Sequence, residues 1–247
     1  MQVKLFGERN TGTRYLARLL EQNLSVDMLA GAPPAWVRRL QRQLPGKEWL
    51  RNAYFVTSAH HNLGWKHSLP NPDQVRNRIG SRSVLVVTLT KNPYAWLVSL
   101  YRRPYHQHWD KRPSFSEFLG KPWQTIRREA AGKNAYASPV TLWNEKNAAY
   151  LALAEQVGAV NMTYENLLQN PSDAIADVAA SAGAKWDPST FVNLESSTKK
   201  STKTHADYRA YYAQEQWRRE FSEDDINLVN RQLSSEVVQA FGYELIR

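Results

Sequence analysis

Apolar residues recur along the chain with two different periods, which predicts strands alternating with helices. Gln2–Phe6 and Ser83–Thr90 are short runs of apolar and β-branched residues, typical of buried parallel strands. Thr13–Asn23 repeats its apolar residues with the helical period. The same patterns predict the remaining elements, which are a strand at Ala159–Thr163, short strand candidates at Tyr54–Thr57 and Gly64–Lys66, and helices at Pro93–Tyr101, Val140–Gln156, Ser172–Ala182 and Glu223–Ala240.

This alternation predicts an α/β fold of three layers (α/β/α), in which helices cover both faces of a central parallel sheet. The sequence has no internal repeat and no low-complexity linker long enough to separate domains, so residues 1–247 are expected to form a single domain. Sheets of this kind bind ligands at the carboxyl ends of their strands. The loops that follow the strands are therefore the expected places for chemistry.

The composition narrows the class of protein. With 42% hydrophobic and 22% charged residues, the chain resembles an ordinary globular protein. It contains no cysteine, which excludes disulfides, thiolate-bound metals and a cysteine nucleophile. The longest apolar run, Val84–Leu89, is far shorter than the roughly 20 residues of a membrane-spanning helix, and no export signal precedes the first strand. We therefore expect no membrane span and a cytoplasmic location.

The positive charge is concentrated in the first half of the chain. The net charge is +9, and residues 1–130 hold 21 Lys and Arg against 8 Asp and Glu, whereas residues 131–247 hold 11 against 15. Such a field suits nucleic acid, an anionic membrane or a small polyanion. The alternative is a solvated basic surface without a ligand.

The first candidate site is the loop from Gly7 to Arg14, between a predicted strand and a predicted helix. Glycine allows close approach of the backbone to a ligand, and the free N–H groups at the start of the helix favour an anion. A nucleotide kinase loop reads G-x-x-x-x-G-K-S/T, but here Thr13 replaces the lysine and Arg14 replaces the hydroxyl that binds Mg²⁺. This difference disfavours chemistry with ATP and Mg²⁺. A capped helix start without a ligand is the alternative.

The second candidate site follows the strand at Ser83–Thr90. Lys91 stands at the end of that strand, and Ser99 lies eight positions later, in the second turn of a helix that Asn92 caps and Pro93 begins. Both side chains are placed to reach one phosphate at the edge of the sheet. A solvated lysine and a neutral helix serine are the alternative interpretation.

Together the two loops resemble those of the sulfotransferase family, whose sulfonate donor is 3′-phosphoadenosine 5′-phosphosulfate (PAPS) and whose nucleotide product is PAP. The family's 5′-phosphosulfate loop, K/R-S/T-G-T-T/S-x-L/F, is similar to Asn10–Leu16, and its 3′-phosphate motif is similar to Lys91–Ser99. Met162–Pro171 resembles the family's Tyr-Glu-Asp-Leu segment, and the closing Phe241–Tyr243 is also family-like. The resemblance implies a P-loop-NTPase-like sulfotransferase fold and transfer of a sulfonate from PAPS to a hydroxyl or amine, without a metal.

The resemblance also implies a donor-binding site. Its expected residues are Arg9, Asn10, Thr11, Gly12, Thr13, Arg14, Tyr15, Lys91, Ser99 and Tyr164, with Lys199, Lys200 and Lys203 closing over the 3′-phosphate. Tyr15 and Tyr164 are expected to contact the adenine, and their alternative role is in the core. The alternative for the lysine cluster is a solvated loop. Asn10 stands where the family has Lys or Arg, so Arg9 is expected to replace that cation, followed in preference by Lys66 and Arg14.

His67 is the expected general base. It lies in Gly64–Pro70, which looks like the family's Lys-x-His-Leu-Pro loop but has Lys66 directly before the histidine. An imidazole with a pKa near 6.5 accepts a proton at neutral pH, and such assistance contributes roughly 10²–10⁴-fold to rate. The expected catalytic residues are therefore His67, Lys66 and Arg9. The alternative is a loop histidine packed near Trp65.

The acceptor is less clearly indicated. Pairs of basic residues alternate with tryptophans in the first half of the chain, which favours an open basic and aromatic groove for an acidic saccharide over a phenol pocket. These residues are Arg38, Arg39, Arg102, Arg103, Lys111, Arg112, Arg127 and Arg128, with Trp36, Trp96, Trp109 and Trp123. The alternatives to a sulfotransferase are a nucleic-acid-binding module, although no nucleic-acid motif is present, and a P-loop kinase with an altered loop. The sequence predicts no oligomeric state.

Overall fold

The centre of the molecule is a parallel β-sheet, seen in a computed structural model that describes residues 1–43, 47–130, 132–196 and 202–247. Among these residues the sheet has four strands, all parallel, in the order β2-β1-β3-β6. The strands of this sheet are β1 (Gln2–Gly7), β2 (Asp27–Met28), β3 (Val84–Thr90) and β6 (Val160–Thr163), and a separate antiparallel pair is formed by β4 (Trp123–Gln124) and β5 (Ala135–Tyr136). The predicted strands Gln2–Phe6, Ser83–Thr90 and Ala159–Thr163 are confirmed.

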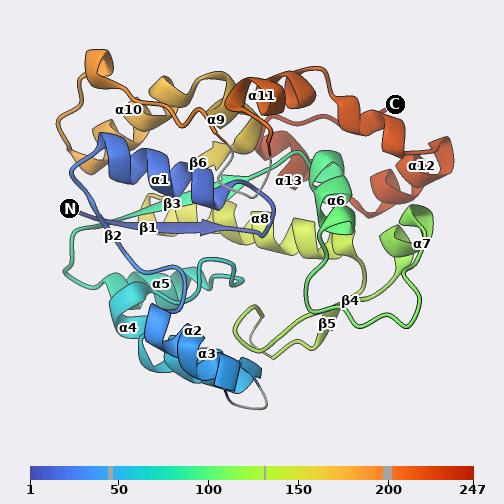
Figure 1. Cartoon of the computed structure of the whole chain (residues 1–247), viewed down its shortest axis with the longest axis horizontal. Helices are drawn as coiled ribbons and strands as arrows, with labels where there is room; N and C mark the ends of the chain where they lie inside the picture. The colour runs from blue at the N-terminus through green and yellow to red at the C-terminus, as the bar shows by residue number, and fades with distance from the viewer. Residues whose placement is uncertain (44–46, 131, 197–201) are drawn as a thin grey trace.

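Helices lie on both faces of the sheet (Figure 1). The α-helices are α1 (Thr13–Asn23), α2 (Ala35–Gln43), α3 (Lys47–Thr57), α4 (Ala59–Asn62), α5 (Pro72–Ile79), α6 (Pro93–Arg102), α7 (Phe115–Gly120), α8 (Pro139–Val157), α9 (Tyr164–Gln169), α10 (Pro171–Ala182), α11 (His205–Ala213), α12 (Glu223–Gln232) and α13 (Ser235–Ala240). Two short 3₁₀ helices are η1 (Pro188–Thr190) and η2 (Gln216–Glu220). Helices α1 and α10 contact each other on one face, whereas α8 lies on the other face with α5 against it. The predicted α/β/α arrangement is therefore confirmed.

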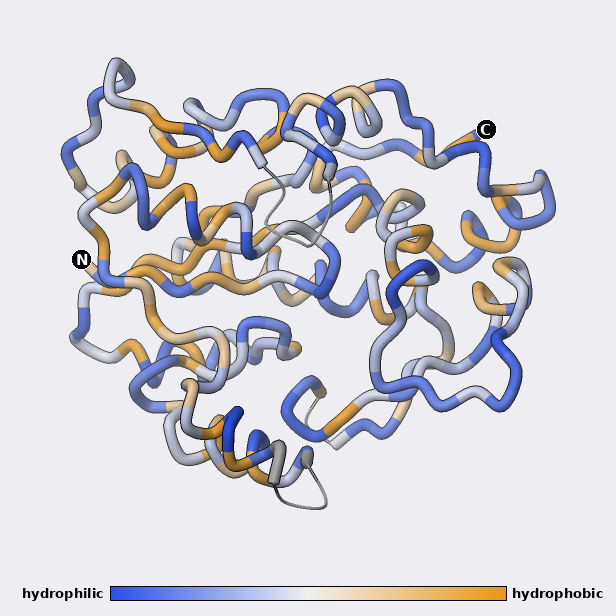
Figure 2. The backbone as a smooth tube through the Cα atoms, viewed as in Figure 1, coloured by the Kyte–Doolittle hydropathy of each residue, from blue (hydrophilic) through white to orange (hydrophobic). Residues whose placement is uncertain are grey.

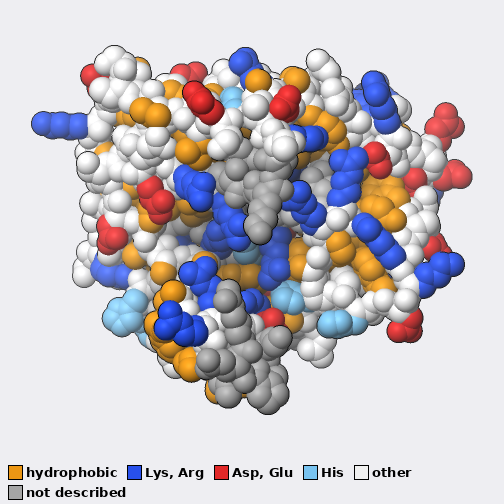
Figure 3. All heavy atoms as spheres, viewed as in Figure 1, with side chains coloured by type: hydrophobic (Ala, Val, Ile, Leu, Met, Phe, Trp, Pro, Cys, Tyr) orange, Lys and Arg blue, Asp and Glu red, His pale blue; other side chains and the backbone are white. Residues whose placement is uncertain are grey.

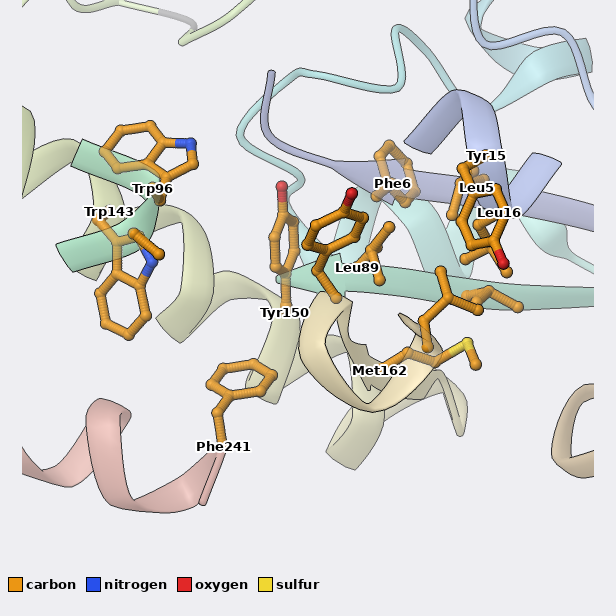
Figure 4. Packing of buried hydrophobic residues seen from close by; sticks show 14 of the residues in the cluster. Leu5, Phe6, Tyr15, Leu16, Leu89, Trp96, Trp143, Tyr150, Met162 and Phe241 are labelled. Carbon is orange, nitrogen blue, oxygen red and sulfur yellow. The ribbon is translucent and has the colours of Figure 1, made fainter. Parts of the chain in front are cut away.

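The core lies between these layers and contains large aromatic side chains. Hydrophobic residues follow the strands and the inner faces of the helices, while the outer turns are hydrophilic (Figure 2). Phe6 of β1 and Trp96 of α6 are fully buried, as is Tyr150 of α8. Figure 4 shows how Trp96 and Trp143, from the contacting helices α6 and α8, extend the core beyond the end of the sheet. The aromatic core thus supports the two loops that follow β1 and β3.

Local capping signals explain where the helices begin. The Asn92 side chain accepts hydrogen bonds from the backbone N–H groups of Tyr94 and Ala95, and Pro93 occupies the first turn of α6. The Ser138 side chain caps α8 in the same way. These caps confirm the predicted starts of both helices to within one residue. Among the described residues, no helix combines the length and apolar character needed to cross a bilayer.

Three sequence predictions are wrong. Tyr54–Thr57 forms the last turn of α3 rather than a strand, because α3 packs against α2 and α4 with Phe55 buried and Val56 63% exposed. Gly64–Lys66 is a turn, although the backbone N–H of Gly7 donates to the carbonyl of Lys66. The predicted helix Glu223–Ala240 is two helices, α12 and α13, because Ser234 caps a second start.

Candidate functional site

The two candidate loops leave neighbouring strands at the same edge of the sheet. Gly7 at the end of β1 pairs with Leu89 of β3, so Glu8–Gly12 and Lys91–Asn92 begin side by side. The Lys91 Nζ donates a hydrogen bond to the backbone carbonyl of Asn10 at 2.7 Å. The carboxyl edge of the sheet therefore joins the loops that the sequence singled out.

The backbone of the first loop explains why asparagine occurs where a cation was expected. Asn10 has a φ of 68°, in the left-handed region that asparagine tolerates better than lysine or arginine. Its side-chain Nδ2 donates to the carbonyl of Arg103 at 3.3 Å, and its own carbonyl faces Lys91. Asn10 thus links the two loops through its backbone.

Gly12 is the N-cap of α1, with a φ of 91°. A Cβ built there would overlap the ring of Tyr164 from α9. We expect Gly12→Ala to lower the free energy of unfolding by more than the ~1–3 kcal/mol that a left-handed alanine costs, because the ring must also move. Urea titration measures this loss.

Gly158→Ala is the matched control for Gly12→Ala. Gly158 also has a positive φ, 66°, but no atom lies within 4 Å of the position where its Cβ would be. Gly158→Ala should therefore lower the free energy of unfolding only by the cost of a left-handed alanine. Equal losses of unfolding free energy in the two variants would show that the contact between Gly12 and Tyr164 is unimportant.

A cavity of about 190 Å³ lies where the two loops meet. It brings together seven of the predicted donor-binding residues: Asn10, Gly12, Tyr15, Lys91, Ser99, Tyr164 and Lys203. Lys and Arg side chains gather around a hollow at the centre of the face in Figure 3, on the side where β1 ends and α1 begins. The cavity therefore combines aromatic surface with positive charge.

Lys91 is the buried cation of this cavity. It is only 2% exposed, and its Nζ lies 2.8 Å from the Tyr212 hydroxyl, 4.2 Å from the centre of the Tyr164 ring and 4.6 Å from that of Tyr212. Burial lowers the pKa of Lys91 to about 7, although Glu165 and Tyr208 act in the opposite direction. An anion that enters the cavity would restore the charge of this amine.

The other predicted donor residues do not line the cavity. Thr11 and Thr13 are buried, and the Thr11 hydroxyl donates to the carbonyl of Glu8 at 2.6 Å. Arg14 is exposed on the first turn of α1. Lys199 and Lys200 lie outside the described residues. The backbone rather than the threonine hydroxyls is therefore the part of the first loop closest to the cavity.

His67 lies beside the end of β1. Its Nδ1 is 2.5 Å from the carbonyl of Gly7, so Nδ1 carries the proton of this hydrogen bond and Nε2 has the lone pair. Burial lowers the pKa of His67 well below 6.5, with further lowering from the neighbouring charge of Lys66. Burial likewise lowers the pKa of Lys66 to about 8, helped by Arg14.

Arg9 points away from the cavity and into an aromatic cluster. Its guanidinium carbon lies 4.0 Å from the ring centre of Tyr105 and 5.0 Å from that of Trp65. Its Nη2 donates to Nε2 of His106 at 2.9 Å. Trp65 also lies 5.1 Å, edge to face, from His67, so Arg9 and His67 share one aromatic neighbour.

Comparisons with known proteins were made at the level of both sequence and structure. No family model matches the sequence, and no curated protein does. Among solved structures, mouse sulfotransferase SULT7A1 complexed with PAP aligns with 96% of this chain and 84% of its own, at 13% identity and a TM-score of 0.54. The chain has a sulfotransferase fold. The resemblance predicted from the two loops is thus confirmed for the architecture.

Two further structures align over nearly their full length with lower scores. The sulfotransferase domain from the curacin biosynthetic pathway covers 99% of this chain and 98% of its own, at 12% identity and a TM-score of 0.49. A sulfotransferase from Alicyclobacillus acidocaldarius covers 98% and 96%, at 14% identity and a TM-score of 0.48.

Within the sulfotransferase fold, the first loop is anchored by a buried ionic cluster. The Lys146 Nζ from α8 lies 2.7 Å from Glu8 Oε2 and 3.6 Å from Glu129 Oε1. The Tyr105 hydroxyl contacts Oε1 of both carboxylates, at 2.7 and 3.1 Å. Lys146 and Glu129 are at most 1% exposed, and burial raises the pKa of Glu129. This cluster fixes the residue that directly follows β1.

Several residues of this cavity were not predicted as donor-binding residues. Arg102 and Arg103 were predicted for the acceptor groove instead, and His205, Tyr208, Tyr211 and Tyr212 were given no role. The tyrosines follow the lysine cluster and precede no strand, so the only sequence signal was their proximity to Lys203. The Nε2 of His205 is buried without a hydrogen-bond partner in the described structure.

The predicted open groove of arginines and tryptophans is wrong in part. Trp96 and Trp123 are at most 1% exposed and belong to the core: the Trp96 Nε1 donates to the carbonyl of Arg9, and the Trp123 ring lies 5.1 Å, edge to face, from that of Tyr105. Trp36 remains exposed on α2. Within the described ranges, no group of three or more His, Asp or Glu side chains is arranged to hold a metal ion.

Proposed function

We propose that this protein transfers a sulfonate group from PAPS to a hydroxyl or amine of an acceptor and releases PAP. The observation that supports this most is the single cavity that joins Gly12 of the first loop to Lys91 and Ser99 of the second, on a sulfotransferase fold. The mouse protein with this fold was crystallised with PAP. A nucleotide with a phosphate group at each end requires two anion-binding loops, and both candidate loops line this cavity.

The residues present fit such a donor. The start of α1 offers backbone N–H groups and the positive end of the helix to the 5′-phosphosulfate. Lys91 and Ser99 would hold the 3′-phosphate, and the unpartnered Nε2 of His205 is a further polar group in the cavity. Tyr15 and Tyr164 line the same cavity and would contact the adenine. Lys203, with Lys199 and Lys200, completes the proposed set.

PAPS supplies an activated sulfonate and a phosphate leaving group. In an in-line displacement the protein chiefly positions the reactants and stabilises the charge that develops on the leaving oxygen. In this proposal the backbone at the start of α1, where Gly12 lines the cavity, faces that charge, whereas Thr11, Thr13 and Arg14 do not line the cavity. Lys66, which directly precedes His67, is the next predicted cation for stabilising the leaving group. Its pKa of about 8 leaves it mostly protonated at pH 7.

His67 is the proposed general base. The hydrogen bond from Nδ1 to the carbonyl of Gly7 sets the tautomer, so Nε2 is available to accept the proton of the acceptor. The lowered pKa of His67 keeps the ring neutral at pH 7, which a base requires. Arg9, which shares Trp65 with His67, is proposed to act at the acceptor side.

We further propose a carbohydrate acceptor, as the basic first half of the chain suggests. We also propose that residues 1–247 form one domain, because buried residues from Val3 to Ile246 belong to one hydrophobic cluster. The cytoplasmic location stays a prediction from the sequence.

The test is thermal unfolding of the full chain with nucleotides. PAP at about 100 times its Kd should stabilise the protein by ~2.7 kcal/mol and raise the Tm by about 5–11 °C, whereas ATP with Mg²⁺ should do much less. Equal shifts, or detectable ATP hydrolysis, would favour the kinase alternative. Salt-sensitive binding of DNA or RNA that survives loss of Lys91 and Ser99 would favour the nucleic-acid alternative.

A further inference from the structure

Arg9 and Arg128, from distant parts of the chain, both lie over the Trp65 ring, which contacts His67, and the charge of a third arginine, Arg51, acts on Arg128 and on His106. Arg9 follows β1, Arg51 lies on α3 and Arg128 precedes β5. We propose that Arg9, Arg51 and Arg128 form a second anion site, separate from the nucleotide cavity, which binds a carboxylate or sulfate group carried by a saccharide. The assignment of that saccharide as the sulfonate acceptor rests on the proposed function.

Arg128 provides the clearest feature of this site. Its side chain is 2% exposed, and its Nη1 donates to Glu48 and, at 3.1 Å, to Oδ1 of Asn52. Its Nε and Nη2, however, are buried without a partner in the described structure. These two N–H groups form the edge of a guanidinium that binds carboxylate or sulfate oxygens in pairs.

The neighbouring arginines have unused donors as well. The Nε atoms of Arg9 and Arg51 are also buried without a partner. Buried donors that lack an acceptor each cost free energy, typically about 1–3 kcal/mol. Such groups at one location in a folded protein require an acceptor, which a bound anion would supply.

The charges at this location also favour an anion. Glu48 pairs with Arg128, which neutralises one of the three guanidinium groups. Burial and the charge of Arg9, with smaller contributions from Arg128 and Arg51 against the opposing effect of Glu48, together lower the pKa of His106 to about 4. His106 is therefore neutral at pH 7, and the positive charge at this location comes from the arginines. Glu8 and Glu129 are paired with Lys146 and with the hydroxyl of Tyr105, although the charge of Arg9 also acts on Glu129.

Trp65 places this anion site next to the proposed base. The guanidinium carbons of Arg9 and Arg128 lie 5.0 and 4.8 Å from the centre of the Trp65 ring, and His67 contacts the same ring. Figure 3 shows Lys, Arg and His side chains gathered in the recess between the sheet and the α2–α3 pair. An acidic group bound here would hold a neighbouring hydroxyl of the same sugar close to Nε2 of His67.

The test is isothermal calorimetry of the full chain with glucuronate, glucose 6-sulfate and uncharged glucose, each with and without saturating PAP. We expect one or both anionic sugars to bind and glucose not to bind, with PAP leaving the binding in place. Arg128→Met and Arg51→Met should each weaken it about 10- to 100-fold. Arg218→Met, which removes an exposed arginine on η2, should change it less than twofold.

Arg51→Met guards against a folding defect, because Arg51 makes no ion pair within the described residues, although its charge also acts on Glu48, and the Tm of this variant should stay close to that of the wild type. No binding of either anionic sugar, or binding that Arg51→Met and Arg128→Met leave unchanged, would overturn the site. Binding that PAP abolishes would place the sugar in the nucleotide cavity and also overturn it. If PAP fails to bind but the sugars still depend on Arg51, the proposed function fails and the anion site stands.

Discussion

Lys146→Met is expected to destabilise the protein by about 3–5 kcal/mol, because it removes the cation from a buried cluster and leaves the carboxylates behind. Lys146 is fully buried, and its Nζ lies 2.7 Å from Glu8 Oε2 and 3.6 Å from Glu129 Oε1. Methionine keeps most of the volume of the lysine stem, so the loss would be electrostatic. Urea unfolding at pH 7 measures it.

The pH dependence distinguishes this cause from poor packing. Burial already raises the pKa of Glu129 and Lys146 opposes this, so without Lys146 the pKa of Glu129 rises further above its value in the unfolded chain. A raised carboxyl pKa contributes stability at low pH that is lost as pH increases through the folded pKa. The deficit of Lys146→Met relative to wild type should therefore be smaller at pH 5 than at pH 8.

Lys133→Met is the matched control, because Lys133 pairs with Glu145 at the surface. Exposed pairs contribute about 0–1 kcal/mol. The triple variant with Lys146→Met, Glu8→Gln and Glu129→Gln should recover part of the lost stability. If Lys146→Met cost no more than Lys133→Met, the cluster would not be what holds the first loop on β1.

Lys91→Ala is expected to weaken PAP binding by about 10- to 100-fold, the contribution of a hydrogen-bonded cation to binding an anion. Lys91 is buried under Tyr164 and Tyr212 and lines the same cavity as Ser99. Isothermal calorimetry of PAP with wild type and variant measures the change. Lys185→Ala, which removes an exposed lysine before η1, should have little effect.

The wild-type affinity should also depend on pH in a defined direction. The pKa of Lys91 is lowered to about 7 in the free protein, so the amine loses its charge as pH increases from 7. A bound phosphate raises this pKa, and PAP affinity should therefore fall by up to about tenfold per pH unit above pH 7. Lys91→Arg, which stays charged, should flatten the profile. A wild-type affinity that is constant from pH 7 to 9 would contradict the role of Lys91.

The local elements of the site could be predicted because their signals lie within a few residues. Gly12 at the start of α1, and Asn92 with Pro93 at the start of α6, are backbone and capping signals that act over one turn. The apolar run of β3 is likewise local. By contrast, Tyr54–Thr57 is apolar enough for either a strand or a helix, and only its packing with neighbouring helices made it the end of α3.

The positions of long polar side chains could not be predicted in this way. Arg9 is next to Asn10 in the sequence, yet it points to Trp65 and Tyr105 while the Asn10 carbonyl faces Lys91. A flexible side chain takes the direction in which its charge is best compensated, and that depends on residues far along the chain. The tyrosines of α11 likewise lie at the cavity through contacts between distant parts of the chain, such as that of Tyr212 with Lys91.

The sequence by itself determined the main strands and helices, the two candidate loops and their place at the carboxyl edge of a parallel sheet. Periodicity, caps and glycine positions are local properties, and parallel strands place their following loops together. Only the tertiary structure decided that Lys91 is buried against Tyr212 and that His67 and Arg9 both contact the Trp65 ring. The same is true of Nε and Nη2 of Arg128, which are buried without a hydrogen-bond partner in the described structure. These arrangements join residues many tens of positions apart, and their energies arise only when the chain has packed.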